Sequence, residues 1–250
     1  MSLLKGLFVL ANFHIVPPRK ILYCMELRGQ KISAFFISVV IAITVTVAVI
    51  LTVVSCSGSK INFKTTFYFV CYAVEDNAIS AGSISNAVSN YGGAGYVLEY
   101  DGAFFVTVSC YYTERDAKSV CESLKRRDLE CEVLKIETDE YALKSTAARK
   151  NAQLYTGNLN TLNSLSTLAY ECANALDTGT YSQSKAKSVL ASLESGLKGL
   201  LNANSENCFS TAIRRLLTEC KNLEGSYIYS KDMRKLQIVI ADSIINAELY

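Results

Sequence analysis

The pattern of apolar residues divides the chain into an uninterrupted apolar run, a stretch that changes period several times, and a helical remainder. The run from Ile32 to Val54 holds 23 residues without a charge, a proline or a glycine. A helix of that length crosses a hydrocarbon core of about 30 Å. In lipid the backbone must satisfy its own hydrogen bonds, so a helix forms despite many β-branched residues. The pattern therefore predicts one transmembrane helix over residues 32–54.

The charges that flank this run predict its orientation. Five basic residues precede the run, whereas only Lys60 and Lys64 follow it closely. The positive-inside rule makes residues 1–31 a cytoplasmic tail and places the rest of the chain outside. The predicted localisation is therefore the cell membrane, with a single pass and extracytoplasmic C-terminal domains.

An alternative anchor involves Cys56. If translation starts at Met25, the apolar run becomes the core of a signal sequence behind a short basic region. The residues before Cys56, Val53-Val54-Ser55, then resemble the lipidation box of bacterial lipoproteins. Lipidation of Cys56 would replace the spanning helix by an acyl anchor. Both alternatives leave the following residues on the same side of the membrane.

A polar linker at residues 55–66 precedes a region, residues 67–138, in which strand and helix periods alternate. Strands and helices are predicted in the order β-α-β-β-α-β at residues 67–74, 77–90, 96–100, 104–112, 113–127 and 131–137. Asp101-Gly102 is typical of a two-residue hairpin turn. Ser80 or Ser83 is the expected N-cap of the first helix, and Thr113 that of the second.

This element order predicts a ferredoxin-like domain of the α+β class. Right-handed crossovers would place the first and third strands at the centre of the sheet. Both helices would then cover one face and leave the other for a second layer or a ligand.

Residues 139–250 show a helical period throughout and predict a small helical bundle. The expected helices lie near residues 139–156, 159–177, 180–202, 206–223 and 230–248. The first of them is expected to stop at Gly157. No recognisable motif assigns a role to this region.

The charged and reactive residues exclude several function classes. The residues after the apolar run carry 20 basic and 22 acidic side chains, a formal charge of −2, so nucleic acid binding has no electrostatic support. His14, the single histidine, precedes the run, so no His-based catalytic site can form beyond it. The nine cysteines include no CxxC pair, and most are expected to be small buried apolar side chains. We therefore predict no enzyme activity, no cofactor and no metal.

Residues 67–137 resemble a SPOR domain, the peptidoglycan-binding module of bacterial division and sporulation proteins. The resemblance is best in the segment FVTVSCYYTERDAKSVCESLKRRDLECEV, which begins at Phe105. Ala117 and Leu124 match the helix anchors of the family, and Tyr111 stands where a phenylalanine is usual. The first strand departs from the family, because it lacks the usual glutamine and glycine, and Ser109 replaces a second glycine.

The resemblance implies binding to glycan strands stripped of stem peptides, on the sheet face that the helices leave open. The hairpin turn predicts that Tyr96 pairs with Thr107 and Leu98 with Phe105, and directly paired residues share a face. Tyrosine suits a neutral sugar, because its ring stacks while its hydroxyl hydrogen-bonds. The predicted glycan-binding residues are Tyr68, Tyr72, Tyr96, Phe105, Thr107, Ser109 and Tyr111.

The opposite face is expected to form the core beneath the two helices. Its predicted members are Phe67, Phe69, Cys71, Phe104, Val106, Val108 and Cys110. The phenolic face has two alternatives to sugar: it could be packed against the C-terminal helices, or it could bind a protein.

The predicted function is thus a non-catalytic, membrane-anchored peptidoglycan-binding protein of cell division or sporulation, with division or sporulation proteins as further partners. The alternative is an extracytoplasmic assembly factor or lipoprotein without glycan affinity.

Overall fold

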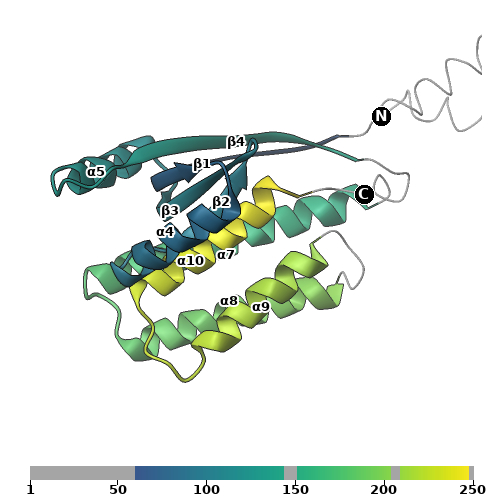
Figure 1. Cartoon of the computed structure of the whole chain (residues 1–250). Coiled ribbons are helices and arrows are strands. Elements are labelled where there is room, and N and C mark those ends of the chain that lie inside the picture. Colours follow the sequence, from purple (N-terminus) through teal and green to yellow (C-terminus); the bar gives the residue numbers. More distant parts are fainter. Residues whose placement is uncertain (1–59, 144–150, 204–208, 248–250) are drawn as a thin grey trace, which may run out of the picture. The chain divides into compact units, whose positions relative to one another are not determined.

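The computed structural model describes residues 60–143, 151–203 and 209–247 (Figure 1). The predicted cytoplasmic tail, transmembrane helix and lipidated Cys56 lie outside these ranges. No helix within the described ranges is long and apolar enough to cross a membrane. The elements are β1 (Lys60–Glu75), α4 (Ala78–Asn90), β2 (Tyr96–Tyr100), β3 (Ala103–Tyr111), α5 (Glu114–Lys125), β4 (Glu132–Ala142), α7 (Ala152–Asp177), α8 (Gln183–Ala203), α9 (Ser210–Leu223) and α10 (Ser230–Ile245).

The described strands form one antiparallel sheet in the order β2-β3-β1-β4. The first and third strands are therefore neighbours at its centre, as predicted. The β2–β3 hairpin turns at Asp101 and Gly102, whose φ angles of 50° and 77° are those of the turn that the sequence predicts. The predicted pairing of Tyr96 with Thr107 and of Leu98 with Phe105 is confirmed.

Helices α4 and α5 begin at side-chain caps. The Asn77 side chain accepts a hydrogen bond from the backbone N–H of Ser80 at 2.9 Å, so the predicted serine caps of α4 are wrong. Asn77 is the N-cap because it stands one position before the first helical residue, where its side-chain oxygen can accept from the N-terminal N–H groups. Thr113 caps α5 as predicted and accepts from the N–H of Asp116.

Both of these helices cover one face of the sheet. Ala81 and Val88 of α4 pack on Val106, and Ala117 of α5 packs in a cluster with Val70. We call this the α4/α5 face.

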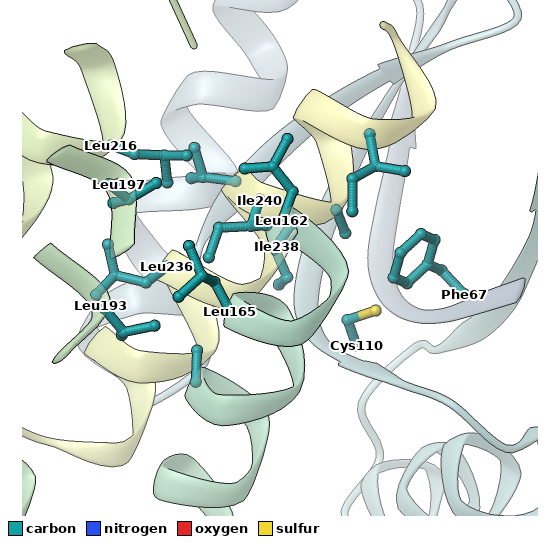
Figure 2. Packing of buried hydrophobic residues seen from close by; sticks show 14 of the residues in the cluster. Phe67, Cys110, Leu162, Leu165, Leu193, Leu197, Leu216, Leu236, Ile238 and Ile240 are labelled. Carbon is teal, nitrogen blue, oxygen red and sulfur yellow. The ribbon is translucent and has the colours of Figure 1, made fainter. Parts of the chain in front are cut away.

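The opposite face is covered as well, by α7 and α10 (Figure 1). Phe67 and Leu98 of the sheet belong to the same continuous apolar core as Leu162 of α7 and Ile238 of α10. Helices α8 and α9 pack on α7 and α10 and form an outer layer. Figure 2 shows their Leu193, Leu197 and Leu216 meeting the inner helices. Sheet and helices are thus parts of one compact unit, residues 58–250.

The bounds differ from the prediction at three places. β1 begins at Lys60 and β4 ends at Ala142, so part of the expected linker and the start of the expected bundle are strand. These two extensions pair with each other, and buried Phe63 and Tyr141 hold the pair against the core. α7 runs unbroken through Gly157, where a Cβ would meet no atom within 4 Å, so the expected stop is wrong.

Candidate glycan-binding surface

The seven predicted glycan-binding residues do not share an open face. Four of them are buried, with exposed fractions of 0 to 7%, and Tyr68, Tyr72 and Phe105 are half-buried. The buried four are Tyr96, Thr107, Ser109 and Tyr111. The expected open phenolic surface is therefore wrong, because helices lie over both faces of the sheet.

Two β-bulges also divide the seven residues between the two faces. Val70 pairs with Ser109 and Cys71 with Thr107, so Val108 is an extra residue in β3; Tyr72 is likewise an extra residue in β1. A bulge shifts the alternation of side chains beyond it.

On the hairpin side of the Val108 bulge, Tyr96 and Phe105 lie in the large core against α7 and α10. On the other side of that bulge, Tyr111 and its paired neighbour Tyr68 belong to the cluster under α5.

The residues expected to pack under α4 and α5 are divided as well. Phe104, Val106 and Val108 do lie on the α4/α5 face. Phe67, Phe69, Cys71 and Cys110 are fully buried, but in the core formed with α7 and α10. Their burial was predicted correctly, and the covering layer was not.

A hydrogen bond joins Tyr96 of the sheet to α10, one of the two helices that cover it. Its hydroxyl donates to a carboxylate oxygen of Asp242 on α10, and the Arg215 guanidinium of α9 lies 5.4 Å from its ring centre. Burial, reinforced by the nearby Asp242 charge, raises the pKa of Tyr96 far above its ordinary value. The phenol therefore stays protonated and serves as a donor inside the fold.

Further along the sheet, three hydrogen bonds join the sheet region to α7 and α10. The Gln237 amide of α10 donates to the Cys110 carbonyl of β3 at 3.1 Å, and Gln237 is completely buried. The Tyr112 hydroxyl donates to Ser166 of α7 at 2.8 Å. The Tyr141 hydroxyl of β4 donates to the carbonyl of Ile244 at 2.7 Å. Removing one partner from such a buried pair leaves the other unsatisfied, so these contacts favour one docked arrangement.

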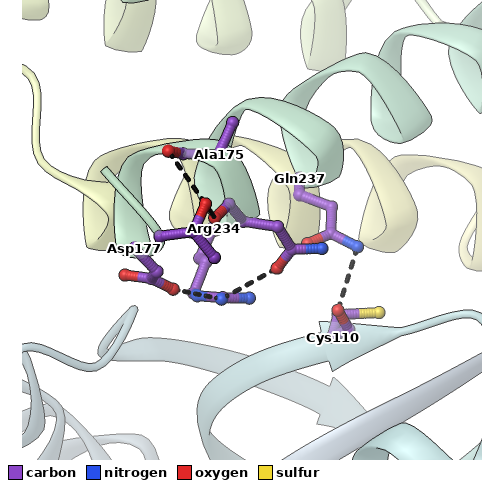
Figure 3. A network of polar contacts seen from close by, with 7 residues as sticks. Cys110, Ala175, Asp177, Arg234 and Gln237 are labelled. Atoms are coloured by element: carbon purple, nitrogen blue, oxygen red, sulfur yellow. Dashed lines mark hydrogen bonds and ion pairs between the residues drawn. The ribbon is translucent and has the colours of Figure 1, made fainter. Parts of the chain in front are cut away.

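Arg234 joins α10 to the end of α7 at the edge of this interface (Figure 3). Its guanidinium donates to the side chains of Asp177 and Asn174 and lies 5.7 Å from the ring centre of Tyr111. Tyr111 also meets Tyr170 of α7 edge-on at 6.0 Å. The Tyr170 ring and the Arg234 guanidinium therefore cover Tyr111, which was predicted to contact a glycan.

The cysteine side chains of the described residues are structural. Burial raises the pKa of Cys71 to about 12 and that of Cys172 to about 11, so these thiols stay protonated at neutral pH. Such thiols behave as small apolar side chains. Cys121 and Cys131 form a disulfide that joins α5 to the start of β4.

The helical cover of the sheet and the exposed aromatic residues were not predicted from the sequence. Residues 236–241 of α10 are all buried, and a helix buried on every side reads as an apolar run without a polar face. That signal is visible in the sequence as Leu-Gln-Ile-Val-Ile-Ala. Among the residues that the structure describes, the most exposed tyrosines are Tyr91 at 92%, Tyr227 at 61% and Tyr229 at 55%. They lie in loops and helix caps, where no periodic pattern marks them.

No family model matches the chain, and no curated protein matches it. A solved structure that is similar to it is the solution structure of the peptidoglycan binding domain of the B. subtilis cell wall lytic enzyme CwlC. The similarity has 18% sequence identity and a TM-score of 0.26, and covers 29% of this chain and 91% of that domain. Similarity at that TM-score does not establish a shared binding activity.

Proposed function

We propose that the chain is a membrane-anchored, non-catalytic protein that binds peptidoglycan outside the cytoplasm. The observation that carries this proposal is the order of elements and strands. The elements follow one another as β1-α4-β2-β3-α5-β4, and the strands are ordered β2-β3-β1-β4 in the sheet. This arrangement is the one expected of a ferredoxin-like unit, the fold that the SPOR resemblance implies. Ala117 of α5, one of the two family helix anchors, is fully buried against the sheet, in the cluster with Val70.

Two further features support an extracytoplasmic location. The apolar run at residues 32–54 has the length and flanking charges of an anchor with its N-terminus inside. The Cys121–Cys131 disulfide is typical of proteins that fold in an oxidising compartment. A lipid anchor on Cys56 would leave the unit in the same place.

The covered sheet changes where glycan would bind. Sugar could reach Tyr96 or Thr107 only if α10 left the sheet, which would break the bond to Asp242 and expose the shared core. We therefore place the glycan contact on the outer surface of the docked unit. The SPOR resemblance further implies that the protein acts during cell division or sporulation.

A second candidate function is an assembly factor that binds proteins and has no affinity for sugar. The covering of both sheet faces favours it, because the phenolic surface is occupied by the chain's own helices. In that case the unit would present helix surfaces, not a sheet, to its partners.

Co-sedimentation separates the two candidates. The fragment of residues 58–250, which is one compact unit, would be mixed with sacculi treated with an amidase to remove stem peptides. Retention on treated sacculi above that on untreated sacculi is expected under the first function. Equal loss from both preparations, with the fragment folded, would leave the assembly function.

A fluorescent fusion of the full chain tests the implied cellular role. Under the peptidoglycan proposal, the signal should concentrate at division septa or at the developing spore, where bare glycan appears. A uniform membrane signal through the cell cycle would contradict that role.

A further inference from the structure

An outer surface of the unit carries aromatic rings that are held rigidly in solvent. Tyr227 and Tyr229 lie in the connection between α9 and α10, and their ring centres are 4.8 Å apart with planes tilted by 46°. Both rings are more than half exposed. The core does not require an exposed aromatic pair of this kind, and exposed aromatic rings are common at ligand-binding sites.

The connection is fixed by its middle residue. Ile228, between the two tyrosines, is fully buried. The side chain of Gln183 at the start of α8 holds both of its backbone groups: the amide donates to the Ile228 carbonyl at 2.8 Å, and the Gln183 oxygen accepts from the Ile228 N–H at 2.9 Å. Because one residue points inward and is bonded on both sides, its two neighbours point outward.

The following turn is fixed as well. The Tyr229 N–H donates to the carboxylate of Asp232 at 2.8 Å, in the first turn of α10. The Lys231 ammonium donates to the Ser89 carbonyl at 2.9 Å, which ties this turn to the end of α4. The same ammonium lies 6.0 Å from the ring centre of Tyr229. Tyr91, the exposed cap of α4, is two residues from Ser89.

We propose that Tyr227, Tyr229 and Lys231, here called the tyrosine platform, are the binding site for a glycan strand. This proposal rests on the peptidoglycan-binding function proposed above and gives it a location. Each phenol offers an apolar ring for the C–H face of a sugar and a hydroxyl for its polar edge. The Lys231 ammonium adds a donor for sugar hydroxyls, acetamido oxygens or the lactyl carboxylate of a stripped strand.

Size favours sugar over a protein partner. A specific protein interface buries about 800 Å² on each partner around a desolvated centre. Two phenol rings offer only a few hundred Å² at most, which suits one or two sugar rings. Because the connection is already held at Ile228 and Tyr229, binding would lose little conformational entropy.

The test uses residues 58–250 and amidase-treated sacculi. We expect the double substitution Tyr227→Ala and Tyr229→Ala to weaken retention at least about tenfold, since two stacking contacts are lost. Tyr227→Phe with Tyr229→Phe keeps the rings and should retain most of the binding. Ile79→Ala is the matched control: it removes a side chain that is 84% exposed at the other end of α4, and should bind like the wild type.

The outcomes separate the binding site from the proposed function. If the wild type is retained and the double alanine variant is retained equally, the platform is not the site although the proposed function stands. If the wild type is not retained, both proposals fail. Retention lost in the Ile79→Ala control as well would indicate non-specific adhesion and overturn the platform. Circular dichroism and thermal unfolding of all variants establish that they are folded.

A second measurement observes the rings directly. Soluble glycan strands released from the treated sacculi would be titrated into protein with isotope-labelled tyrosine rings. The ring signals of Tyr227 and Tyr229 should shift, whereas those of buried Tyr96 should not. Shifts at neither ring during binding would contradict the platform. Capture of a cell protein in place of glycan, with no ring shift on adding glycan, would favour the assembly function.

Discussion

The hydroxyl of Tyr96 donates a hydrogen bond to the carboxylate of Asp242, 146 residues further along the chain. The bond joins a strand of the sheet to the last helix of the described chain. It makes a residue that the sequence assigns to a ligand part of the internal packing, and its contribution can be measured.

We expect Tyr96→Phe to lower the free energy of unfolding by about 1 kcal/mol, because the Asp242 carboxylate loses a donor in a partly buried place. Urea unfolding of Tyr96→Phe, Asp242→Ala and the double variant forms a mutant cycle. The two effects should be less than additive. Tyr100→Phe, at the end of the same strand, should change stability little; strict additivity in the cycle would show that the bond contributes nothing.

Stability should fall in strong alkali through Tyr141. Burial raises its pKa from 10.0 to about 12 in the folded protein. A raised pKa means that the folded state holds the proton more tightly, so this stabilisation is present below pH 10 and is lost as pH rises toward 12. The urea midpoint measured from pH 8 to pH 12 should therefore decline above pH 10.

The buried thiols also contribute to that decline, because the pKa of Cys71 is raised as well. Tyr141→Phe isolates the tyrosine part: its decline should be shallower than that of the wild type. Parallel curves for the two proteins would contradict a role for Tyr141.

Two glycines of α8 should respond differently to alanine. A Cβ at Gly196 would stand 2.8 Å from Leu165 of α7, whereas a Cβ at Gly199 meets nothing within 4 Å. Gly196→Ala should be less stable than Gly199→Ala by about 1–3 kcal/mol, because its Cβ would crowd the methyl groups of Leu165 and overpack the contact. Gly199→Ala should raise the free energy of unfolding by about 0.5–1 kcal/mol, because alanine has a higher helix propensity than glycine at an exposed position. Thermal unfolding of both variants checks the helix contact, and equal shifts would refute it.

The Cys121–Cys131 disulfide should stabilise the unit by about 2.5 kcal/mol, as expected for a loop of this length. Adding a reductant should lower the unfolding free energy of the wild type to that of Cys121→Ala with Cys131→Ala. The double variant should not respond to reductant. A response there would mean that another pair of cysteines is bonded.

The local structure of the sheet region could be predicted from the sequence because its signals are local. Asp101-Gly102 determined the hairpin and its register, and Thr113 determined the start of α5. The bulge at Val108 could not be predicted, since nothing in β3 marks an extra residue and its cause is pairing with a distant strand. That single residue moved Ser109 and Tyr111 off the face expected for them.

The predicted glycan-binding face was wrong because the packing of the helices on the sheet could not be predicted from the sequence. A tyrosine on a strand with alternating apolar and polar residues is compatible with an exposed or a covered face, because its ring is apolar and its hydroxyl needs only one hydrogen-bond partner. The partners here, Asp242 and Ser166, come from helices far along the chain. The segment Leu-Gln-Ile-Val-Ile-Ala of α10, apolar except for Gln237, is the part of the sequence that indicated a helix buried on most sides.

The long separation in sequence between the sheet and α10 affects how the unit folds during synthesis. Synthesis proceeds at about 5–20 residues per second, so Leu98 leaves the ribosome roughly 7–28 seconds before Ile240, which belongs to the same core. During that interval the sheet's apolar residues have no cover, and such surface invites aggregation. Folding of this unit should therefore benefit from a holdase chaperone that stays bound until α10 has emerged.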